Sequence, residues 1–261
     1  MLKKIVVLVL SLSLLGILVG CNQESALSRI KENGKIVLGT TADYPPYEFH
    51  KIIDGQDQIV GFDIDIAKLI AEELDVELEI INMRFEGLLP ALVTDDIDMV
   101  IAGMVADEER SKTADFSIPY YEAEQRMVVR AEDKDIYLGP EELVGKDIGA
   151  QKSTIQENIA LDRFSESEYI GLSKITDLIL ELQNKKIEAV LLAEPVAKAY
   201  VEQNDSIVMA DINLGKEDGV AVALNKGNED LLEIINKLLE ENIADGTIDK
   251  LISEATLLAE E

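Results

Sequence analysis

The chain has 261 residues, of which 52 are acidic and 24 are basic, so its formal net charge is −28. This balance excludes a phosphate-backbone partner, because nucleic-acid binding needs clustered Lys and Arg, and it indicates a solvated acidic exterior. Cys21 is the only cysteine and His50 the only histidine, which excludes an internal disulfide and a histidine-rich metal site. We expect no metal and no cofactor. The length fits one large domain or two modest lobes that each bury a core.

Residues 1–20 have the pattern of a lipoprotein signal peptide. Lys3 and Lys4 precede an apolar stretch over 5–19 that is short for a membrane span. The following Leu-Val-Gly-Cys resembles a bacterial lipobox, in which the cysteine carries the lipid after cleavage. The resemblance implies an extracytoplasmic protein anchored to the cell membrane through Cys21, with residues 21–34 as a tether. The alternative is an ordinary signal peptide with an incidental cysteine.

Strand and helix patterns alternate over the next part of the chain. The apolar run Ile36–Leu38 predicts a strand, and two prolines make residues 40–49 a rigid loop, because proline fits neither a central strand nor a helix interior. The aromatic side chains of this loop are either ligand contacts or ordinary packing: Tyr44, Tyr47 and Phe49. Beyond it we expect a hairpin or loop over 50–60, helices over 63–74 and from 85, and a strand over 76–80. This alternation predicts a parallel sheet with helices on its faces.

The stretch from 95 to 121 carries the clearest sign of a binding site. An apolar strand over 99–102 breaks at Gly103, and Asp107 begins a short charged helix that contains Arg110. Backbone N–H groups at a helix start favour an anion, and the planar guanidinium matches a carboxylate with two hydrogen bonds. The stretch therefore predicts capture of a small carboxylate. In the alternative interpretation, Arg110 only pairs with a neighbouring side chain such as Asp115.

The second half repeats the plan of strand, polar turn and helix start. We expect strands over 126–129, 188–192 and 207–209, a polar turn over 151–157 at a helix start, helices over 175–182 and 196–201, a long strand over 218–224, and final helices over 228–242 and 247–259. Crossings near Gln125 and Asp218 divide the chain into two lobes. We expect residues 35–125 and 218–261 to form one lobe and residues 126–217 the other.

Together these motifs resemble the bacterial ABC-transporter solute-binding proteins of the polar amino-acid family. The resemblance extends over about 36–255 and rests on the segments 39–49, 61–65, 85–92, 102–110, 114–121, 151–157 and 194–197. It implies the two-lobed α/β fold of type II periplasmic binding proteins, in which each lobe is a mostly parallel sheet flanked by helices and two hinge crossings join the lobes. It also implies a monomer that is not an enzyme, captures a polar amino acid between closing lobes and delivers it to a membrane permease.

The same resemblance implies roles for individual residues. Arg110 would hold the ligand α-carboxylate, helped by the backbone of Gly103 and Val105 and, from the facing lobe, by Thr154 and Ser153. Tyr44 and Phe85 would enclose the ligand side chain, and Thr41 would stand where the family often places a polar group. Four acidic side chains favour a cationic ligand side chain if they are near the cleft, or are surface charge if they are not: Glu48, Glu86, Asp107 and Glu194.

Two positions depart from the family pattern. Val105 stands where Ser or Thr is usual, and Ala193 stands where the family has the acidic partner of the α-amino group. Glu194 is adjacent, but neighbouring strand residues point to opposite sides. Either Glu194 or another carboxylate takes this role, or the ligand is not a standard α-amino acid. Two rival functions follow: a dehydratase of small carboxylic acids on the same fold, and a sensor or surface lipoprotein with a degenerate cleft.

Overall fold

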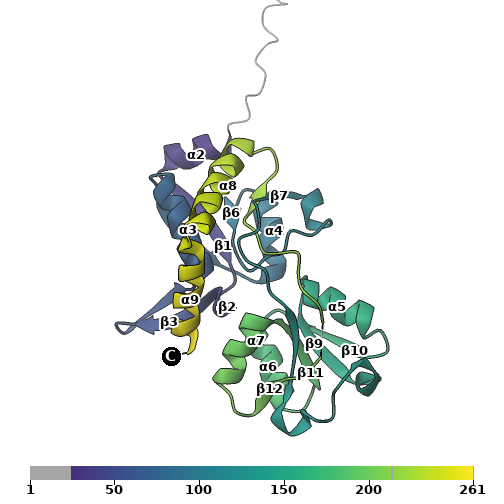
Figure 1. Ribbon diagram of the computed structural model, residues 1–261. Helices are drawn as coiled ribbons and strands as arrows, with labels where there is room; N and C mark the ends of the chain where they lie inside the picture. Colours follow the sequence, from purple (N-terminus) through teal and green to yellow (C-terminus); the bar gives the residue numbers. More distant parts are fainter. Residues whose placement is uncertain (1–24, 213, 261) are drawn as a thin grey trace, which may run out of the picture.

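The computed structural model describes residues 25–212 and 214–260 and shows two α/β lobes, one above the other in Figure 1. Each lobe is built on its own five-stranded sheet. The predicted signal peptide and Cys21 lie outside the described residues. Within the described ranges, no helix is both long and apolar enough to cross a membrane.

The sheet of lobe 1 has the strand order β5-β1-β6-β13-β7. Its strands are β1 (Lys35–Thr40), β5 (Glu77–Asn82), β6 (Met99–Val100), β7 (Ala114–Phe116) and β13 (Ala223–Asn225). β1 pairs in parallel with β5 and β6, whereas β13 is antiparallel to both β6 and β7. Four strands therefore run in one direction, and the reversed one is the strand that enters from the other lobe.

Helices cover this sheet, and a small second sheet extends from it. The helices are α2 (Ala26–Asn33), α3 (Phe62–Glu73), α4 (Phe85–Val93), α8 (Glu229–Ala244) and α9 (Thr247–Glu260). On α3, the apolar spacing of Ile66 and Ile70, continued at Leu74, buries one face against the core. A meander of β2 (Asp43–Tyr44), β3 (Glu48–Ile53) and β4 (Gln56–Val60) lies beside the end of α9 (Figure 1).

Lobe 2 repeats the plan with the strand order β10-β9-β11-β8-β12. Its strands are β8 (Gln125–Arg130), β9 (Asp147–Gln151), β10 (Glu168–Leu172), β11 (Ala189–Ala193) and β12 (Ile207–Met209), and its α-helices are α5 (Ile155–Arg163), α6 (Ile175–Gln183) and α7 (Glu194–Glu202). β9 is parallel to β10 and β11, and β8 is antiparallel to β11 and β12. The reversed strand is again the one that enters from the other lobe, so both sheets are mostly parallel, as predicted.

Two extended segments, the first crossing (residues 117–124) and the second crossing (residues 215–222), connect the lobes and are hydrogen-bonded to each other. Tyr120 N donates to Val220 O at 3.0 Å, Val220 N donates to Tyr121 O at 2.8 Å, and Glu217 N donates to Ala123 O at 3.1 Å. The long strand predicted over 218–224 is wrong, because only its end belongs to β13. Val220 instead makes isolated bridges to Val105 and Tyr121, so the segment exchanges partners as it passes between the lobes.

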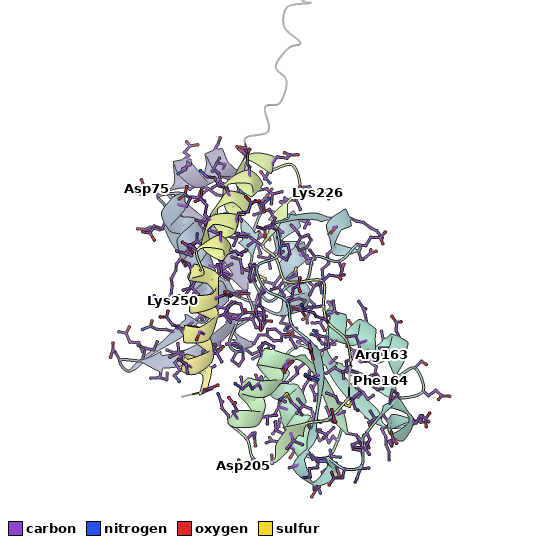
Figure 2. All side chains as sticks on the ribbon, viewed as in Figure 1. Asp75, Arg163, Phe164, Asp205, Lys226 and Lys250 are labelled. Atoms are coloured by element: carbon purple, nitrogen blue, oxygen red, sulfur yellow. The ribbon has the colours of Figure 1, made fainter. Side chains whose placement is uncertain are left out.

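Charged side chains project from the outer surface of both lobes. Figure 2 shows Asp75 and Lys226 at the edge of lobe 1 and Asp205 at the edge of lobe 2, and all three are exposed. This distribution agrees with the solvated exterior that the composition predicts.

The tether predicted over 21–34 is corrected by the structure, because its second part is the helix α2. Ile30 is 1% exposed and belongs to the main core cluster. The Ala26 N–H donates to the Asn228 side chain at 2.9 Å, and the Ser25 hydroxyl caps the helix by accepting from Ser28 N. Residues 26–33 are therefore a packed part of lobe 1.

This packing predicts that Ile30→Ala lowers the free energy of unfolding by about 2–5 kcal/mol, because it removes a buried side chain and leaves a cavity. Glu32→Ala on the exposed face of the same helix is the matched control, and we expect it to change the stability by less than about 0.5 kcal/mol. Urea denaturation followed by circular dichroism measures both. Equal midpoints for the two variants would contradict a packed α2.

Candidate functional site

A polar cavity lies between the lobes, where parallel strands of both sheets end. It is lined by Thr41, Tyr44, Phe85, Ala102, Gly103, Val105, Arg110, Gln151, Thr154, Ile155, Gln156 and Glu217. Several of these residues follow β1, β5 or β6 in lobe 1 or β9 in lobe 2, at the strand ends where ligands bind in open α/β sheets, whereas Glu217 lies on the second crossing. Seven of the nine residues proposed from the sequence line it, all except Ser153 and Glu194.

Arg110 is held at this cavity by a single turn of backbone. The Asp107 side chain accepts from Arg110 N at 2.8 Å, and the short helix predicted from Asp107 is a turn that ends in the 3-10 helix η1 (Arg110–Lys112). The Arg110 Nη1 donates to Val105 O at 2.7 Å, and its guanidinium lies 5.4 Å from the centre of the Phe85 ring. These contacts place a planar cation, 9% exposed, at the wall of the cavity.

The second guanidinium nitrogen links the two lobes. Arg110 Nη2 donates to Ser153 O in lobe 2 at 2.8 Å, so Ser153 contributes its carbonyl to the site and not its side chain. Burial lowers the pKa of Arg110, and the Asp107 charge opposes that shift. Of the neighbours that the alternative interpretation allows, Asp115 pairs with Lys226 at 3.0 Å, whereas Asp107 Oδ2 lies 3.4 Å from Arg110 Nε and forms an ion pair with it. The two terminal guanidinium nitrogens thus donate to neutral carbonyls, which a carboxylate would replace with a stronger acceptor.

The facing wall comes from the turn before α5. Thr154 caps this helix by accepting from Glu157 N and donates to Gln151 O at 2.7 Å, so the polar turn predicted at a helix start is confirmed. Gln156 donates to the Gln125 side-chain oxygen at 2.8 Å, and its Nε2 lies 3.5 Å from the Tyr44 hydroxyl. The start of a helix and a row of side-chain amides therefore face Arg110 across the cavity.

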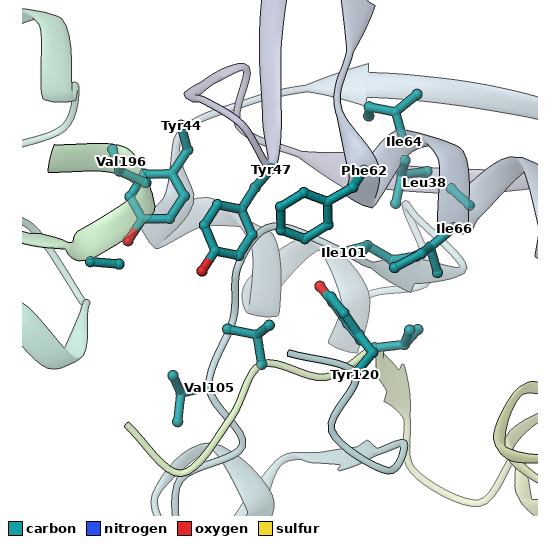
Figure 3. Packing of buried hydrophobic residues seen from close by; sticks show 14 of the residues in the cluster. Leu38, Tyr44, Tyr47, Phe62, Ile64, Ile66, Ile101, Val105, Tyr120 and Val196 are labelled. Atoms are coloured by element: carbon teal, nitrogen blue, oxygen red, sulfur yellow. The ribbon is translucent and has the colours of Figure 1, made fainter. Parts of the chain in front are cut away.

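The aromatic residues of the 40–49 loop divide between packing and the cavity. Figure 3 shows Tyr44, Tyr47 and Phe62 in a row, with ring centres 5.1 Å apart for the first pair and 4.5 Å apart for the second. Tyr47 is fully buried, and Phe49 belongs to a separate apolar cluster, so ordinary packing holds for both. Tyr44 lines the cavity at the end of the row. Phe85, under the guanidinium, is the second aromatic side chain of the site.

A buried carboxylate in the core of lobe 1, that of Asp63, holds the loop at Gly103 by a hydrogen bond. Asp63 accepts from Gly103 N at 2.7 Å and from the Tyr120 hydroxyl at 2.8 Å. Gly103 has a φ of +54°, and a Cβ there would lie 2.9 Å from the Tyr44 ring, so the position requires glycine. Burial raises the pKa of Asp63 to about 6. Glu48 beside it is fully buried, and neither of its carboxyl oxygens meets a hydrogen-bond donor among the described residues.

Five cavity residues were missed by the sequence analysis, and three of them are polar: Gln151, Gln156 and Glu217. Glu217 lies on the second crossing and accepts from Ala123 N at 3.1 Å and from Gln125 Nε2 at 2.8 Å. The two glutamines belong to the 151–157 turn that the sequence had already marked, so its polar composition could have identified them. Glu217 follows no strand and carries no motif, and its partners lie more than 90 residues away in the chain.

None of the acidic residues that favoured a cationic ligand lines this cavity. Glu194 pairs with Arg126 at 3.1 Å, and Glu86 accepts from the Ser173 hydroxyl at 2.6 Å. Asp107 holds Arg110, and Glu48 is in the core of lobe 1. The structure therefore does not bring Glu194 to the site. Across the described part of the chain, no group of three His, Cys, Asp or Glu residues is placed to hold a metal ion.

Two mostly parallel α/β lobes, joined by paired crossings around a polar cavity, define the type II periplasmic binding-protein class. The chain belongs to the bacterial extracellular solute-binding proteins, family 3, whose family model matches residues 36–255. The family and the fold that the motifs predict are thereby confirmed.

Individual relatives agree with this assignment. The arginine-binding extracellular protein ArtP of Bacillus subtilis is 33% identical over 256 residues, which cover 95% of this chain and 96% of ArtP. The substrate-binding protein AbpA of Streptococcus pneumoniae, solved bound to L-arginine, superposes with a TM-score of 0.86 at 39% identity over 89% of this chain and 99% of that one. An ancestral amino acid-binding protein, described as a precursor of cyclohexadienyl dehydratase, has a TM-score of 0.80 at 31% identity over 89% of this chain and 99% of its own.

The Glu48–Asp63 pair predicts how stability depends on pH. Burial and the nearby Asp63 charge raise the pKa of Glu48 well above 4.5, so between the unfolded and folded pKa values the folded protein holds more protons than the unfolded one. The free energy of unfolding therefore falls as the pH rises through that window, by about 1.4 kcal/mol per pH unit for one group. Glu48→Gln removes this loss. We therefore expect the free energy of unfolding of the variant to increase relative to that of the parent as the pH rises from 4.5.

Urea denaturation at a series of pH values measures the difference between variant and parent. Glu109→Gln is the control, because its side chain is exposed on the surface of the same lobe. We expect it to follow the parent at every pH. A constant offset between Glu48→Gln and the parent would contradict a protonated Glu48.

Proposed function

We propose that this protein is the substrate-binding lipoprotein of an ABC importer. It captures a polar amino acid between its two lobes, on the extracytoplasmic face of the cell membrane, and delivers it as a monomer to the membrane permease. The single observation that carries the proposal is the buried Arg110 at the interlobe cavity, whose guanidinium contacts backbone carbonyls of both lobes. The arginine-bound relative supports an amino acid with a cationic side chain as the first ligand to test.

The contacts of Arg110 suggest how the ligand binds. Its α-carboxylate takes the place of the carbonyl acceptors and receives two parallel N–H bonds from the guanidinium. Gly103 and Val105 present backbone beside it, the capped start of α5 with Thr154 faces it, and the ligand side chain lies between Tyr44 and Phe85. The two hydrogen-bonded crossings absorb the change in backbone as the lobes close, in the manner of a hinge.

A dehydratase is the rival that one observation favours, because Glu217 places a carboxyl group with a pKa of about 7 in the cavity. Dehydration needs a general acid within reach of the leaving hydroxyl. Both Glu217 oxygens already accept hydrogen bonds, from Ala123 and Gln125, and the relatives are named as binding proteins. Binding without turnover is therefore the proposed activity.

Titration calorimetry against the twenty amino acids tests this function, with L-arginine first. We expect saturable heat without product, and we expect Arg110→Ala to weaken that binding by about 30-fold to a few thousand-fold. Removing one partner of a buried charge pair costs about 2–5 kcal/mol, and about 1.4 kcal/mol corresponds to tenfold in affinity. Arg110→Lys should recover only part of the loss, because an ammonium group cannot form the fork.

Lys112→Ala is the control for these variants, since Lys112 lies on the same turn but pairs at the surface with Glu109. Its affinity should equal that of the parent. Turnover of a hydroxy acid would support the dehydratase instead, and the absence of heat with every amino acid would support the degenerate cleft. An Arg110→Ala variant that is folded and binds within threefold of the parent would remove Arg110 from the site.

The proposed anchor predicts that Cys21→Ser releases the protein from membranes and leaves its fold unchanged, because only the lipid on Cys21 would hold it there. Fractionation of cells measures the distribution, and circular dichroism of the released protein checks the fold. Ser25→Ala is a suitable control, because it changes a nearby residue and leaves Cys21 in place. A Cys21→Ser protein that stays as membrane-bound as the parent would contradict the lipid anchor.

A further inference from the structure

The interlobe cavity contains one pair of opposite charges. Among its lining residues, all within the described ranges, Arg110 is the one cation and Glu217 the one carboxylate. An α-amino acid carries a carboxylate and an ammonium group on the same carbon atom. Such a ligand needs a cation and an anion close together in its site, and this cavity offers one of each.

We propose that Glu217 binds the ligand's α-ammonium group and thus takes the place of the acidic residue that the family has at position 193. The inference rests on the proposed function, because it names the partner of one group of the amino acid that Arg110 would hold by its carboxylate. It assigns to the second crossing a direct role in selecting the ligand.

The geometry fixes Glu217 at the cavity wall. Its backbone N–H donates to Ala123 O at 3.1 Å and its side chain accepts from Ala123 N at 3.1 Å, so both ends are tied to the first crossing. Gln125, which donates to its Oε2, is in turn held by Gln156 at 2.8 Å. The side chain is 9% exposed and therefore reaches a ligand only through the cavity.

The positions that the family pattern would suggest cannot supply this carboxylate. Ala193 ends β11 beneath the start of α7 and is 1% exposed, so it has neither a charge nor access. Glu194 lies outside the cavity and pairs with Arg126, which also pairs with Glu124. Glu217 is the carboxylate that remains.

The charge of Glu217 is poorly balanced without a ligand. Its hydrogen-bond partners Ala123 and Gln125 are neutral donors. Burial raises its pKa to about 7, even though these two hydrogen bonds and, to a smaller extent, the Arg110 charge oppose the shift. An ammonium group in contact with it would favour the ionised form. Binding would then convert a partly protonated carboxyl group into one side of an ion pair.

The test compares Glu217→Gln with Glu194→Gln, two isosteric changes that remove one negative charge each. With L-arginine as the probe, or with whichever of the twenty amino acids binds in its place, we expect Glu217→Gln to weaken binding by about 30-fold or more. Glu194→Gln should bind within threefold of the parent. Glutamine keeps an oxygen for the Ala123 N–H, so the fold should survive, and the melting temperature of each variant checks it.

A second ligand identifies the group that Glu217 contacts. The α-hydroxy analogue of L-arginine lacks the ammonium group but keeps the carboxylate and the side chain. The parent should bind it much more weakly than L-arginine, and in Glu217→Gln this difference should shrink, because the coupled pair is then already broken. An undiminished difference in a folded Glu217→Gln variant would show that another residue holds the ammonium group, and would overturn the inference.

A measurement on the unaltered protein covers the case in which Glu217→Gln does not fold. A carboxyl group with a pKa of about 7 is ionised to about one-tenth at pH 6 and about nine-tenths at pH 8, so the affinity for L-arginine should rise about tenfold over this range. The groups that surround it electrostatically are Arg110, Glu122, Lys216, Tyr44, Tyr47 and Tyr121.

Lys216 and the three tyrosines have pKa values raised above 10, so Lys216 stays charged and the tyrosines stay neutral between pH 6 and pH 8. Asp63, which lies beside Glu48, accepts a hydrogen bond from Gly103 and has a pKa of about 6. Its titration changes the affinity for L-arginine by no more than about twofold between pH 6 and pH 8. A flat affinity between pH 6 and pH 8 would overturn the inference. If the unaltered protein binds no amino acid at all, the proposed function fails and the inference with it; if it binds one and only the Glu217 results are negative, the function stands.

Discussion

The site depends on one buried carboxylate, that of Asp63 in the first turn of α3. The N-terminal end of a helix favours a negative charge, and Asp63 uses that charge to accept from the Gly103 N–H and the Tyr120 hydroxyl. It thereby joins three segments that are distant in sequence: the start of α3, the loop after β6 and the first crossing. The loop after β6, which leads to Arg110, is thus fixed to the core of lobe 1 by the hydrogen bond from Gly103 to Asp63.

The aromatic loop is fixed to the same helix start by backbone contacts. Phe62 N donates to Pro46 O and Asp63 N donates to Tyr47 O, at 3.2 and 3.0 Å. Gly61 permits this approach, because a Cβ there would lie 2.1 Å from the Tyr47 carbonyl oxygen. Tyr44 therefore reaches the cavity from a rigid support. A site built on such a support keeps its geometry on the lobe 1 side, and the adjustable contacts are those that lobe 2 makes.

Sequence reasoning identified the parts of this arrangement that have a local signal. Hydrophobic spacing placed most helices and strands, and the Gly103 break with Asp107 and Arg110 pointed to residues of the candidate site. It missed α2, because only Ala26 and Ile30 of that helix are buried and two positions make no visible period. The strand predicted over 218–224 began too early, because most of these residues belong to the second crossing. A crossing buried between the lobes is as apolar as a strand, so the composition does not distinguish them.

The contacts between the lobes left no trace in the local pattern. The Ser153 acceptor of Arg110 is a carbonyl group, which every residue possesses, so no residue type reveals it. Glu217 meets its partners only once the two crossings lie side by side, 92 residues apart in the chain for Gln125. Where a motif residue was absent, at Ala193, the sequence showed the loss but did not indicate the carboxylate that we propose in its place. Long-range pairing determines such positions, and a single sequence carries little information about it.

The packing of α2 against lobe 1 also limits how the molecule can stand on a membrane. With the lipid on Cys21 as proposed, only three residues lie between the anchor and the Ser25 cap, and the four residue steps reach about 14 Å at full extension. Lobe 1 would then be held close to the lipid surface, and lobe 2 would be the lobe that moves when the two lobes open and close. The tether would restrict the orientation of the protein relative to the permease. The protein would then reach its docked orientation by rotating about the short linker to Cys21 and not by free diffusion.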